Sequence, residues 1–342
     1  MGTCLLKDGT LIGDYHRPYV IAEVNSSHNG DIKIAKMMID AAKEAECDCV
    51  KFQSWSSETL YSKTYYKSNP IAKRFVDKFS LSEDDLREVA KYCNSIGIGF
   101  SSTPYSESEV DFLVDINAPF IKIASMELNN PKFLRYIARK SVPIVLSTGM
   151  GETSEITRAV DTILESGNNQ LILLHCISIY PAEESTINLN NIVGLRERFP
   201  QCPIGFSDHT LGDAIGVGAT ALGAAALEKH LTLDKKKIGM DNQMAMEPEA
   251  LKEYVKKCRM VNTALGSKDR TVLEEEYKQR ENMRRSLVAT RNISAGEIIS
   301  ERDLYAKRPG TGIAPDKINT LIGRTAINDI EADTVINILD IK

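Results

Sequence analysis

The chain has 342 residues, 26% of them charged, and a formal net charge of −5 at pH 7. This length allows a large core without disulfide or metal staples, and the acidic balance argues against nucleic acid or an anionic membrane as partner. Seven scattered cysteines without a CxxC pair are typical of a reduced, cytoplasmic protein, and we expect neither a signal peptide nor a membrane span because no window approaches twenty apolar residues.

Eight short apolar runs alternate with longer segments of helical period, an alternation typical of βα units and a parallel sheet. The runs comprise residues 19–24, 49–53, 98–103, 120–125, 143–149, 171–176, 203–208 and 225–230. Eight such units in about 265 residues match the size of a (β/α)8 (TIM) barrel, which we assign to residues 1–265. An eight-stranded open sheet is the alternative fold.

Amphipathic helices are predicted between these strands, and capping residues mark some of their ends. The clearest cover residues 32–46, 82–97 and 154–167. Ser82 and Ser154 are the predicted N-caps, and Gly97 and Gly167 are the predicted C-terminal ends.

The character of the sequence changes after the barrel. Residues 266–284 are charged and lack a strand pattern, which predicts a linker or an exposed helix. Residues 285–342 combine short strands, glycine turns and one helical turn, which indicates a small, β-rich domain. Because about 57 residues is near the lower limit for independent folding, we expect this domain to dock on the barrel or on another subunit.

Polar residues end nearly every predicted strand. The active site of a (β/α)8 barrel lies at the C-terminal ends of its strands, so these side chains are candidate site residues. They are Glu23, Lys51, Gln53, Ser101, Ser102, Thr103, Lys122, Ser125, Ser147, Thr148, His175, Ser178, Tyr180, Ser207, Asp208, His209, Glu228, Lys229 and His230.

Two lysines, Lys51 and Lys122, interrupt otherwise apolar strands. An unpaired buried charge is costly, so an anion is a natural partner for them. With nearby hydroxyl groups they would surround a phosphate with donors, namely Thr103, Ser125, Ser147 and Ser207. The alternative is that each lysine pairs with a glutamate of a neighbouring strand.

His209 and His230 end the two last strands, which are adjacent in a barrel. Their imidazoles would converge on one point at the barrel mouth and bind a divalent metal, leaving open positions for water and substrate. The alternative is a pair of packing histidines. His175 is either a further ligand or a core residue, and His28 would face the mouth and orient substrate.

A set of motifs occurs in order along essentially the whole chain: AEVNSSHNGD, VKFQSW, SSTP, IKIAS, LSTGM, LLHCISIYP, IGFSDHT and EKHLTLD, followed by KRPGTGI. In sequence and in order, these motifs resemble those of the sialic acid synthase family. The resemblance implies a (β/α)8 barrel with a C-terminal SAF (antifreeze-like) domain. It also implies condensation of phosphoenolpyruvate with N-acetylmannosamine or a related acylated amino sugar. The products would be phosphate and a nine-carbon 2-keto acid, such as sialic, legionaminic or pseudaminic acid.

The resemblance also assigns roles to particular residues. Phosphoenolpyruvate contacts fall on Lys51, Thr103, Lys122, Ser125, Ser147, Ser178 and Ser207, and sugar contacts fall on Glu23, Gln53, Tyr180 and Asp241. His209 and His230 would hold a divalent metal, Mn2+ with Mg2+ or Co2+ as alternatives. In the domain-swapped homodimer that the family implies, Arg308 would enter the other chain's barrel and bind the N-acyl group of the sugar.

Three positions depart from the family pattern. Ser27 and Ser178 stand where the family usually has asparagine, and Met240 stands where it usually has proline. All three are expected near the substrate pocket, so they leave the identity of the sugar open.

Two carboxylates complete the predicted site. Glu23 ends the first strand, where we expect it to move a proton or to position the attacking water. Its alternative role is an ion pair with Lys51 or Lys122. Glu228 is expected to orient a neighbouring ligand of the metal.

Two other functions compete with this hypothesis. A synthase acting on a phosphorylated sugar would need a second phosphate site, for which the strand ends offer no additional cluster of lysine and arginine. A non-catalytic glycan-binding protein is the alternative outside enzymes.

Overall fold

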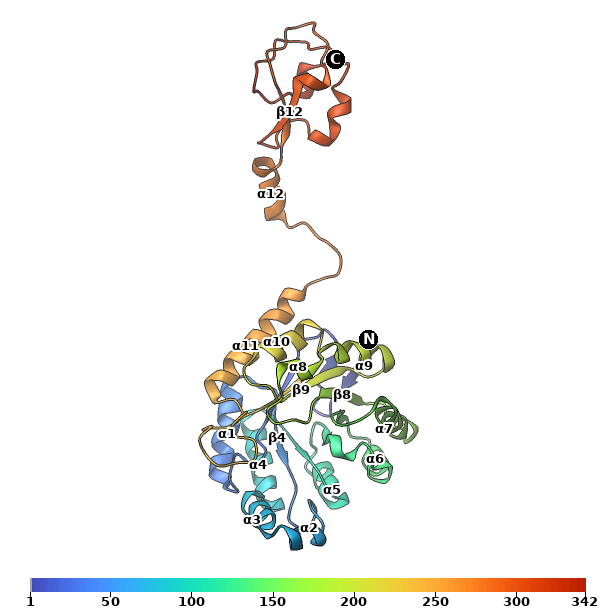
Figure 1. Ribbon diagram of the computed structural model, residues 1–342, viewed down its shortest axis with the longest axis vertical. Coiled ribbons are helices and arrows are strands. Elements are labelled where there is room, and N and C mark those ends of the chain that lie inside the picture. Colours follow the sequence, from blue (N-terminus) through green and yellow to red (C-terminus); the bar gives the residue numbers. More distant parts are fainter. Residues whose placement is uncertain (1) are drawn as a thin grey trace. The chain divides into compact units, whose positions relative to one another are not determined.

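The computed structural model describes residues 2–342, which form two compact units that divide after Gly266 (Figure 1). The strands of the first unit are β1 (Thr3–Leu5), β2 (Leu11–Gly13), β3 (Tyr19–Glu23), β4 (Cys49–Gln53), β5 (Gly99–Thr103), β6 (Ile121–Ile123), β7 (Ile144–Ser147), β8 (Leu171–Cys176), β9 (Ile204–Asp208) and β10 (Ala226–His230). All eight predicted barrel strands are present as β3 to β10.

Helices follow these strands and surround them (Figure 1). They are α1 (Ile32–Glu44), α2 (Lys63–Ser68), α3 (Pro70–Phe79), α4 (Glu83–Ile96), α5 (Glu107–Asp115), α6 (Pro131–Ala138), α7 (Thr153–Glu165), α8 (Glu184–Ile187), α9 (Asn190–Arg198), α10 (Ala214–Ala221) and α11 (Pro248–Leu265). No helix within residues 2–342 combines the length and the apolar composition needed to cross a membrane.

The predicted helix ends are confirmed at one helix and corrected at another. Ser82 caps α4 by accepting a hydrogen bond from the Asp85 backbone, and Gly97 ends the helix in the left-handed region at φ 70°. The N-cap prediction for Ser154 is wrong, because α7 begins earlier with Glu152 as its N-cap. The Glu155 carboxylate accepts the Glu152 N–H there at 2.9 Å, which leaves Ser154 inside the helix.

The eight parallel strands form a nearly closed barrel in the order β5, β4, β3, β10, β9, β8, β7, β6. The two end strands meet at the seam, where the Ser101 hydroxyl donates a 2.8 Å hydrogen bond to the Phe120 carbonyl directly before β6. The open-sheet alternative is therefore wrong. Short-range alternation alone could not decide this point, because both folds use the same strands.

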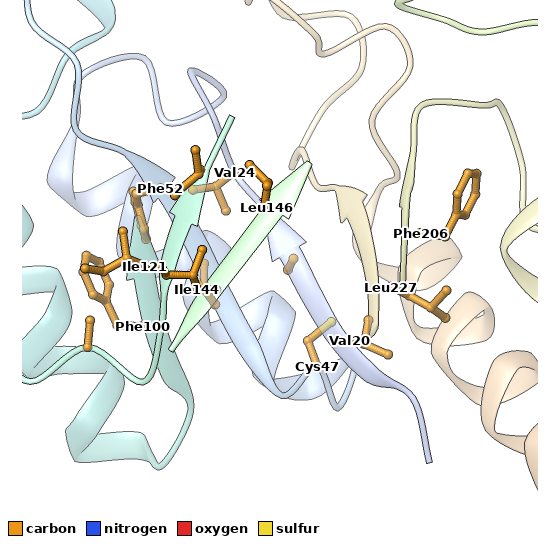
Figure 2. Packing of buried hydrophobic residues seen from close by; sticks show 14 of the residues in the cluster. Val20, Val24, Cys47, Phe52, Phe100, Ile121, Ile144, Leu146, Phe206 and Leu227 are labelled. Atoms are coloured by element: carbon orange, nitrogen blue, oxygen red, sulfur yellow. The ribbon is translucent and has the colours of Figure 1, made fainter. Parts of the chain in front are cut away.

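Successive residues of each strand point to opposite sides of the barrel wall. One set, including Ile21, Cys49 and Ile172, fills the barrel interior together with the N-terminal hairpin of β1 and β2. The other set, including Val20, Phe52 and Leu227, packs against the surrounding helices (Figure 2). A polar residue at the C-terminal end of a strand therefore reaches the barrel mouth only when it is an even number of positions away from the interior residues of that strand, so that its side chain points inward.

The second unit, Ser267–Lys342, contains α12 (Glu274–Met283), β11 (Ser286–Ala289) and β12 (Leu304–Lys307), with β11 and β12 antiparallel. Helix α12 buries none of its side chains. The core lies downstream of α12 and includes Leu287, Ile299 and Ile336, each at most 2% exposed.

Candidate active site

A cavity of about 240 Å³ lies at the C-terminal ends of the barrel strands, and each of the eight strands or its following loop contributes to its wall. The residues of the first unit to which the family resemblance assigns a substrate or metal contact all line it, namely Glu23, Lys51, Gln53, Thr103, Lys122, Ser125, Ser147, Ser178, Tyr180, Ser207, His209, His230 and Asp241. Arg308 belongs to the second unit, where it is exposed directly after β12.

Another cavity, about 450 Å³, lies outside the barrel wall against β8. It shares only Met150 and Cys176 with the first cavity, and neither a lysine nor a carboxylate lines it. Arg198 and His175 do line the larger cavity, but only the smaller of the two brings lysines, carboxylates and a pair of histidines together.

The two buried lysines pair with glutamates across the barrel interior. Lys51 forms an ion pair with Glu23 and lies 3.6 Å from Glu228, and Lys122 lies 3.7 Å from the same Glu228 carboxylate. Burial raises the pKa of Glu228, but Lys122 and Lys51 outweigh burial and lower this pKa to about 2. Both lysines are thus paired with glutamates, which is the alternative that the sequence left open, and two lysines balance two glutamates in charge.

Glu228 has a larger place in the site than the sequence predicted. It lines the cavity, contacts both lysines and accepts a 2.8 Å hydrogen bond from the Ser207 hydroxyl. Glu228 therefore contacts three of the predicted anion-binding residues, Lys51, Lys122 and Ser207.

Glu23 is held from three directions. Its Oε1 accepts hydrogen bonds from the Asn25 backbone at 2.9 Å and from Gln53 Nε2 at 3.2 Å, and Lys51 pairs with its Oε2. The oxygen of Gln53 in turn accepts bonds from the Tyr105 hydroxyl at 2.8 Å and the Trp55 indole at 2.9 Å. Burial raises the pKa of Glu23 above its ordinary value although Lys51 opposes the shift.

Hydroxyl donors cluster beside the lysines. Lys51 Nζ lies 3.2 Å from Thr103 Oγ1, and Lys122 Nζ lies 2.8 Å from Ser147 Oγ. Gly149 N–H donates to Ser125 Oγ at 3.0 Å. A Cβ at Gly149 would lie 2.3 Å from Ser178 Oγ, so only glycine lets the backbone approach these hydroxyls so closely.

The two predicted metal ligands face one another, with ring centroids 5.5 Å apart. His209 Nδ1 lies 2.7 Å from the Ile177 carbonyl. A carbonyl can only accept, so Nδ1 carries a proton, and Nε2 is the nitrogen that holds the lone pair when the ring is neutral. The Tyr180 ring packs over His209 at 4.2 Å between centroids. Among the described residues, no three His, Cys, Asp or Glu side chains gather into a metal-binding cluster.

Several candidate residues point away from the cavity because they alternate with the inward-pointing residues of their strands. Ser102 bonds Ser54 at 2.6 Å, His175 bonds the Ile187 carbonyl at 2.6 Å, and Thr148 donates to the Leu174 carbonyl at 2.9 Å. Asp208 and Lys229 form a buried ion pair at 2.9 Å behind the barrel wall. His175 is therefore a packing residue, as its alternative proposed.

His28 also lies outside the cavity lining. It is 2% exposed, packs against Phe52 and accepts a 3.1 Å hydrogen bond from Gly30 N–H. The expectation that it orients substrate is not supported by these contacts.

Five residues of the cavity wall were not predicted from the sequence: Tyr105, Ala124, Met126, Met150 and Cys176. Cys176 is an even number of positions from Ile172 and Leu174, which point inward, and was recoverable from the strand pattern. Tyr105 lies in the loop after β5, where no period indicates direction.

Comparisons with known proteins decide the family. Residues 38–270 match the NeuB family, and residues 284–342 match the SAF domain. The chain belongs to the NeuB family. The SAF match covers the part of the chain in which the sequence predicted a small C-terminal domain.

Two relatives of this NeuB-family chain match it over nearly their full length. The N,N'-diacetyllegionaminic acid synthase of Legionella pneumophila is 38% identical over 93% of each chain. The human N-acetylneuraminate-9-phosphate synthase is 35% identical over 97% of this chain and 94% of its own. Since these relatives are synthases, the chain is an enzyme of the sialic acid synthase kind.

A solved structure extends the likeness to three dimensions. The N-acetylneuraminic acid synthetase of Leptospira borgpetersenii, in complex with citrate, matches with a TM-score of 0.75 at 29% identity. The match covers 81% of this chain and 96% of that chain.

Proposed function

We propose that this enzyme condenses phosphoenolpyruvate with an unphosphorylated 2-acetamido sugar to form a nine-carbon 2-keto acid and phosphate. The observation that carries the proposal is one cavity in which two lysines and a ring of hydroxyls lie beside His209, His230 and Asp241. This arrangement joins an anion site to a second site of different chemistry, as a two-substrate condensation requires.

Phosphoenolpyruvate carries about three negative charges on its phosphate and carboxylate groups. Lys51 and Lys122 would bind them through their ammonium groups, and Ser125 and Ser147 would donate hydrogen bonds. Ser207 would donate only after its hydroxyl turned away from Glu228, to which it donates here. Because Glu23 and Glu228 already balance the lysines, tight binding needs further positive charge.

The residues present fit a divalent metal. In the neutral form of His209, Nε2 holds the lone pair because Nδ1 donates to the Ile177 carbonyl. Burial lowers the pKa of His209, but the contact with Cys176 outweighs burial and raises it above its ordinary value, whereas burial holds the pKa of His230 well below its ordinary value. A bound cation would favour the neutral, ligating form of both rings. The ion, Mn2+ or alternatively Mg2+ or Co2+, would supply the missing positive charge and Lewis acidity toward the sugar carbonyl oxygen.

The condensation joins C3 of phosphoenolpyruvate to C1 of the open-chain sugar, and the C1 oxygen takes up a proton. Water then attacks C2, and the C–O bond to phosphate breaks to leave the 2-keto acid. Glu23 is placed to hold this water and accept its proton, because Asn25, Gln53 and Lys51 fix its carboxylate at the cavity wall.

The lining favours a sugar without a phosphate group. Its only cations besides histidine are Lys51 and Lys122, and both lie deep among carboxylates. Gln53, Tyr180 and Asp241 offer uncharged or acidic partners to the sugar instead. The human relative's name makes a phosphorylated sugar the second candidate substrate.

Phosphate release from phosphoenolpyruvate tests the proposal. The sugars to compare are N-acetylmannosamine, its 2,4-diacetamido-6-deoxy analogue, the corresponding altrose analogue and phosphorylated N-acetylmannosamine, each with Mn2+ and with a chelator. We expect release with one unphosphorylated sugar and loss of release on chelation. Release only with the phosphorylated sugar would favour the second candidate, and none with any sugar would favour a glycan-binding protein.

We also propose that the barrel mouth is covered by a second copy of the chain in a domain-swapped dimer. Large apolar side chains are exposed on the loops after five barrel strands, at 43–75% of their surface: Met126, Met150, Ile179, Tyr180, Leu211, Ile238 and Met240. An apolar rim of this extent marks an interaction surface.

Arg308→Ala tests this assembly. Loss of a charge-assisted hydrogen bond to the N-acyl group should raise the sugar KM by about 10- to 100-fold, with less than about twofold change for phosphoenolpyruvate. Steady-state kinetics with each substrate varied in turn measures the effect. Arg324→Ala, another exposed arginine of the same unit, is the control, and an unchanged sugar KM in Arg308→Ala would refute the role.

A further inference from the structure

Two loops beside the candidate site are fastened to each other by three side-chain contacts. One loop, residues 24–31, follows β3, and the other, residues 231–247, follows β10. Asn25 Nδ2 donates to the Asp241 carboxylate, Ser26 Oγ accepts from Met240 N–H at 3.0 Å, and Ser27 Oγ donates to Asn242 Oδ1 at 2.5 Å.

Four of the six residues in these contacts are buried. Asn25, Ser26, Ser27 and Asn242 are each at most 7% exposed, and none of them lines the cavity. A buried polar group that loses its partner pays its full desolvation cost, so each contact constrains the loops strongly. The loops leave the paired strands β3 and β10, and the Leu231 N–H donates to the Glu23 carbonyl at 2.8 Å at their base. Beyond this backbone contact, the three side-chain contacts hold the two loops together.

Asn25 connects two carboxylates of the site. Its backbone N–H donates to Glu23 Oε1 at 2.9 Å, while its side chain holds Asp241. Its backbone adopts the left-handed region at φ 36°, which asparagine tolerates better than most residues. Asn25 therefore sets the position of Asp241 relative to Glu23.

Asn242 anchors the other side of the contact. Its Nδ2 donates to the Lys237 carbonyl at 3.1 Å while its Oδ1 accepts from Ser27. A Cβ at Gly239 would lie 2.4 Å from the same Oδ1. The side chain is thus closely confined, and the residue directly before it is Asp241.

We propose that Asn25, Ser27 and Asn242 form a loop latch that positions Asp241 for hydrogen bonding to the sugar. This inference rests on the proposed function and makes the three residues positioning residues for sugar recognition. Asp241 lines the cavity and its carboxylate accepts hydrogen bonds from hydroxyl or amide N–H groups. Asn25 also reaches Glu23, which pairs with the anion donor Lys51. Ser27 and Asn242 contact none of the lysines and hydroxyls of the anion site, so breaking their contact should act on the sugar.

Ser27→Ala and Asn242→Ala test the latch, because each should change the KM for the sugar and leave the KM for phosphoenolpyruvate nearly unchanged. Each variant should raise the sugar KM about tenfold, as expected for loss of one buried hydrogen bond, with less than about twofold change in the KM for phosphoenolpyruvate. The double variant should be no worse than the poorer single variant, because both substitutions break the same contact. Gln243→Ala, an exposed neighbour on the same loop, is the matched control.

Equal increases in both KM values, additive effects in the double variant, or an equal effect of Gln243→Ala would overturn the proposal. Hydrogen exchange separates this proposal from the proposed function. Amides of residues 239–246 should exchange faster in Ser27→Ala than in the wild type, and unchanged exchange would refute the latch even if the wild-type chain turned over none of the sugars.

Discussion

Replacing either His209 or His230 by alanine should reduce metal-dependent turnover by at least about 10³-fold, because polarisation of a carbonyl by a divalent ion is worth several kcal/mol. With one imidazole left, the site would lack the paired ligands that face each other across 5.5 Å between ring centroids. Phosphate release at saturating Mn2+ measures the rate, and isothermal titration with Mn2+ measures binding independently of turnover.

The control for these variants is His16→Ala, since His16 is exposed and lies outside the cavity lining. It should retain the wild-type rate and Mn2+ affinity. Circular dichroism should show that all three variants keep the fold. Full activity of His209→Ala or His230→Ala in metal-free buffer would remove the metal from the proposed mechanism.

Lys229→Met should destabilise the barrel by about 3–5 kcal/mol, because it leaves the buried Asp208 carboxylate without its partner. Lys229 is 1% exposed, lies 2.9 Å from Asp208 Oδ2 and donates to the Thr210 carbonyl at 2.6 Å. Urea unfolding followed by tryptophan fluorescence isolates the barrel, since the chain's single tryptophan, Trp55, is buried in the first unit.

A second variant separates charge from packing. Asp208→Asn with Lys229→Met removes both charges but keeps the Oδ1 oxygen that accepts hydrogen bonds from the Thr210 N–H and hydroxyl at 2.9 and 2.7 Å. This double variant should recover most of the lost stability. If it is as unstable as Lys229→Met alone, the loss comes from packing and the ion-pair account is wrong.

The sequence by itself determined the strands and most of the polar residues that line the candidate cavity. Runs that alternate with helical segments located all eight barrel strands, and the rule that barrel sites lie at strand ends identified residues that do line the cavity. The alternation of side chains along a strand also predicts that Glu228 and Lys229 point in opposite directions. Adjacent residues face opposite sides of the barrel wall, so only Glu228 reaches the interior.

Only the tertiary structure decided which side chains meet across the barrel and between loops. Glu228 of β10 contacts lysines of β4 and β6, neither of which neighbours it in the sheet, so the pairing depends on barrel closure. Ser27 and Asn242 lie in loops, which have no period to indicate direction. Local pattern encodes the period of an element and the face it buries, whereas contacts across a closed barrel depend on the spacing of its walls.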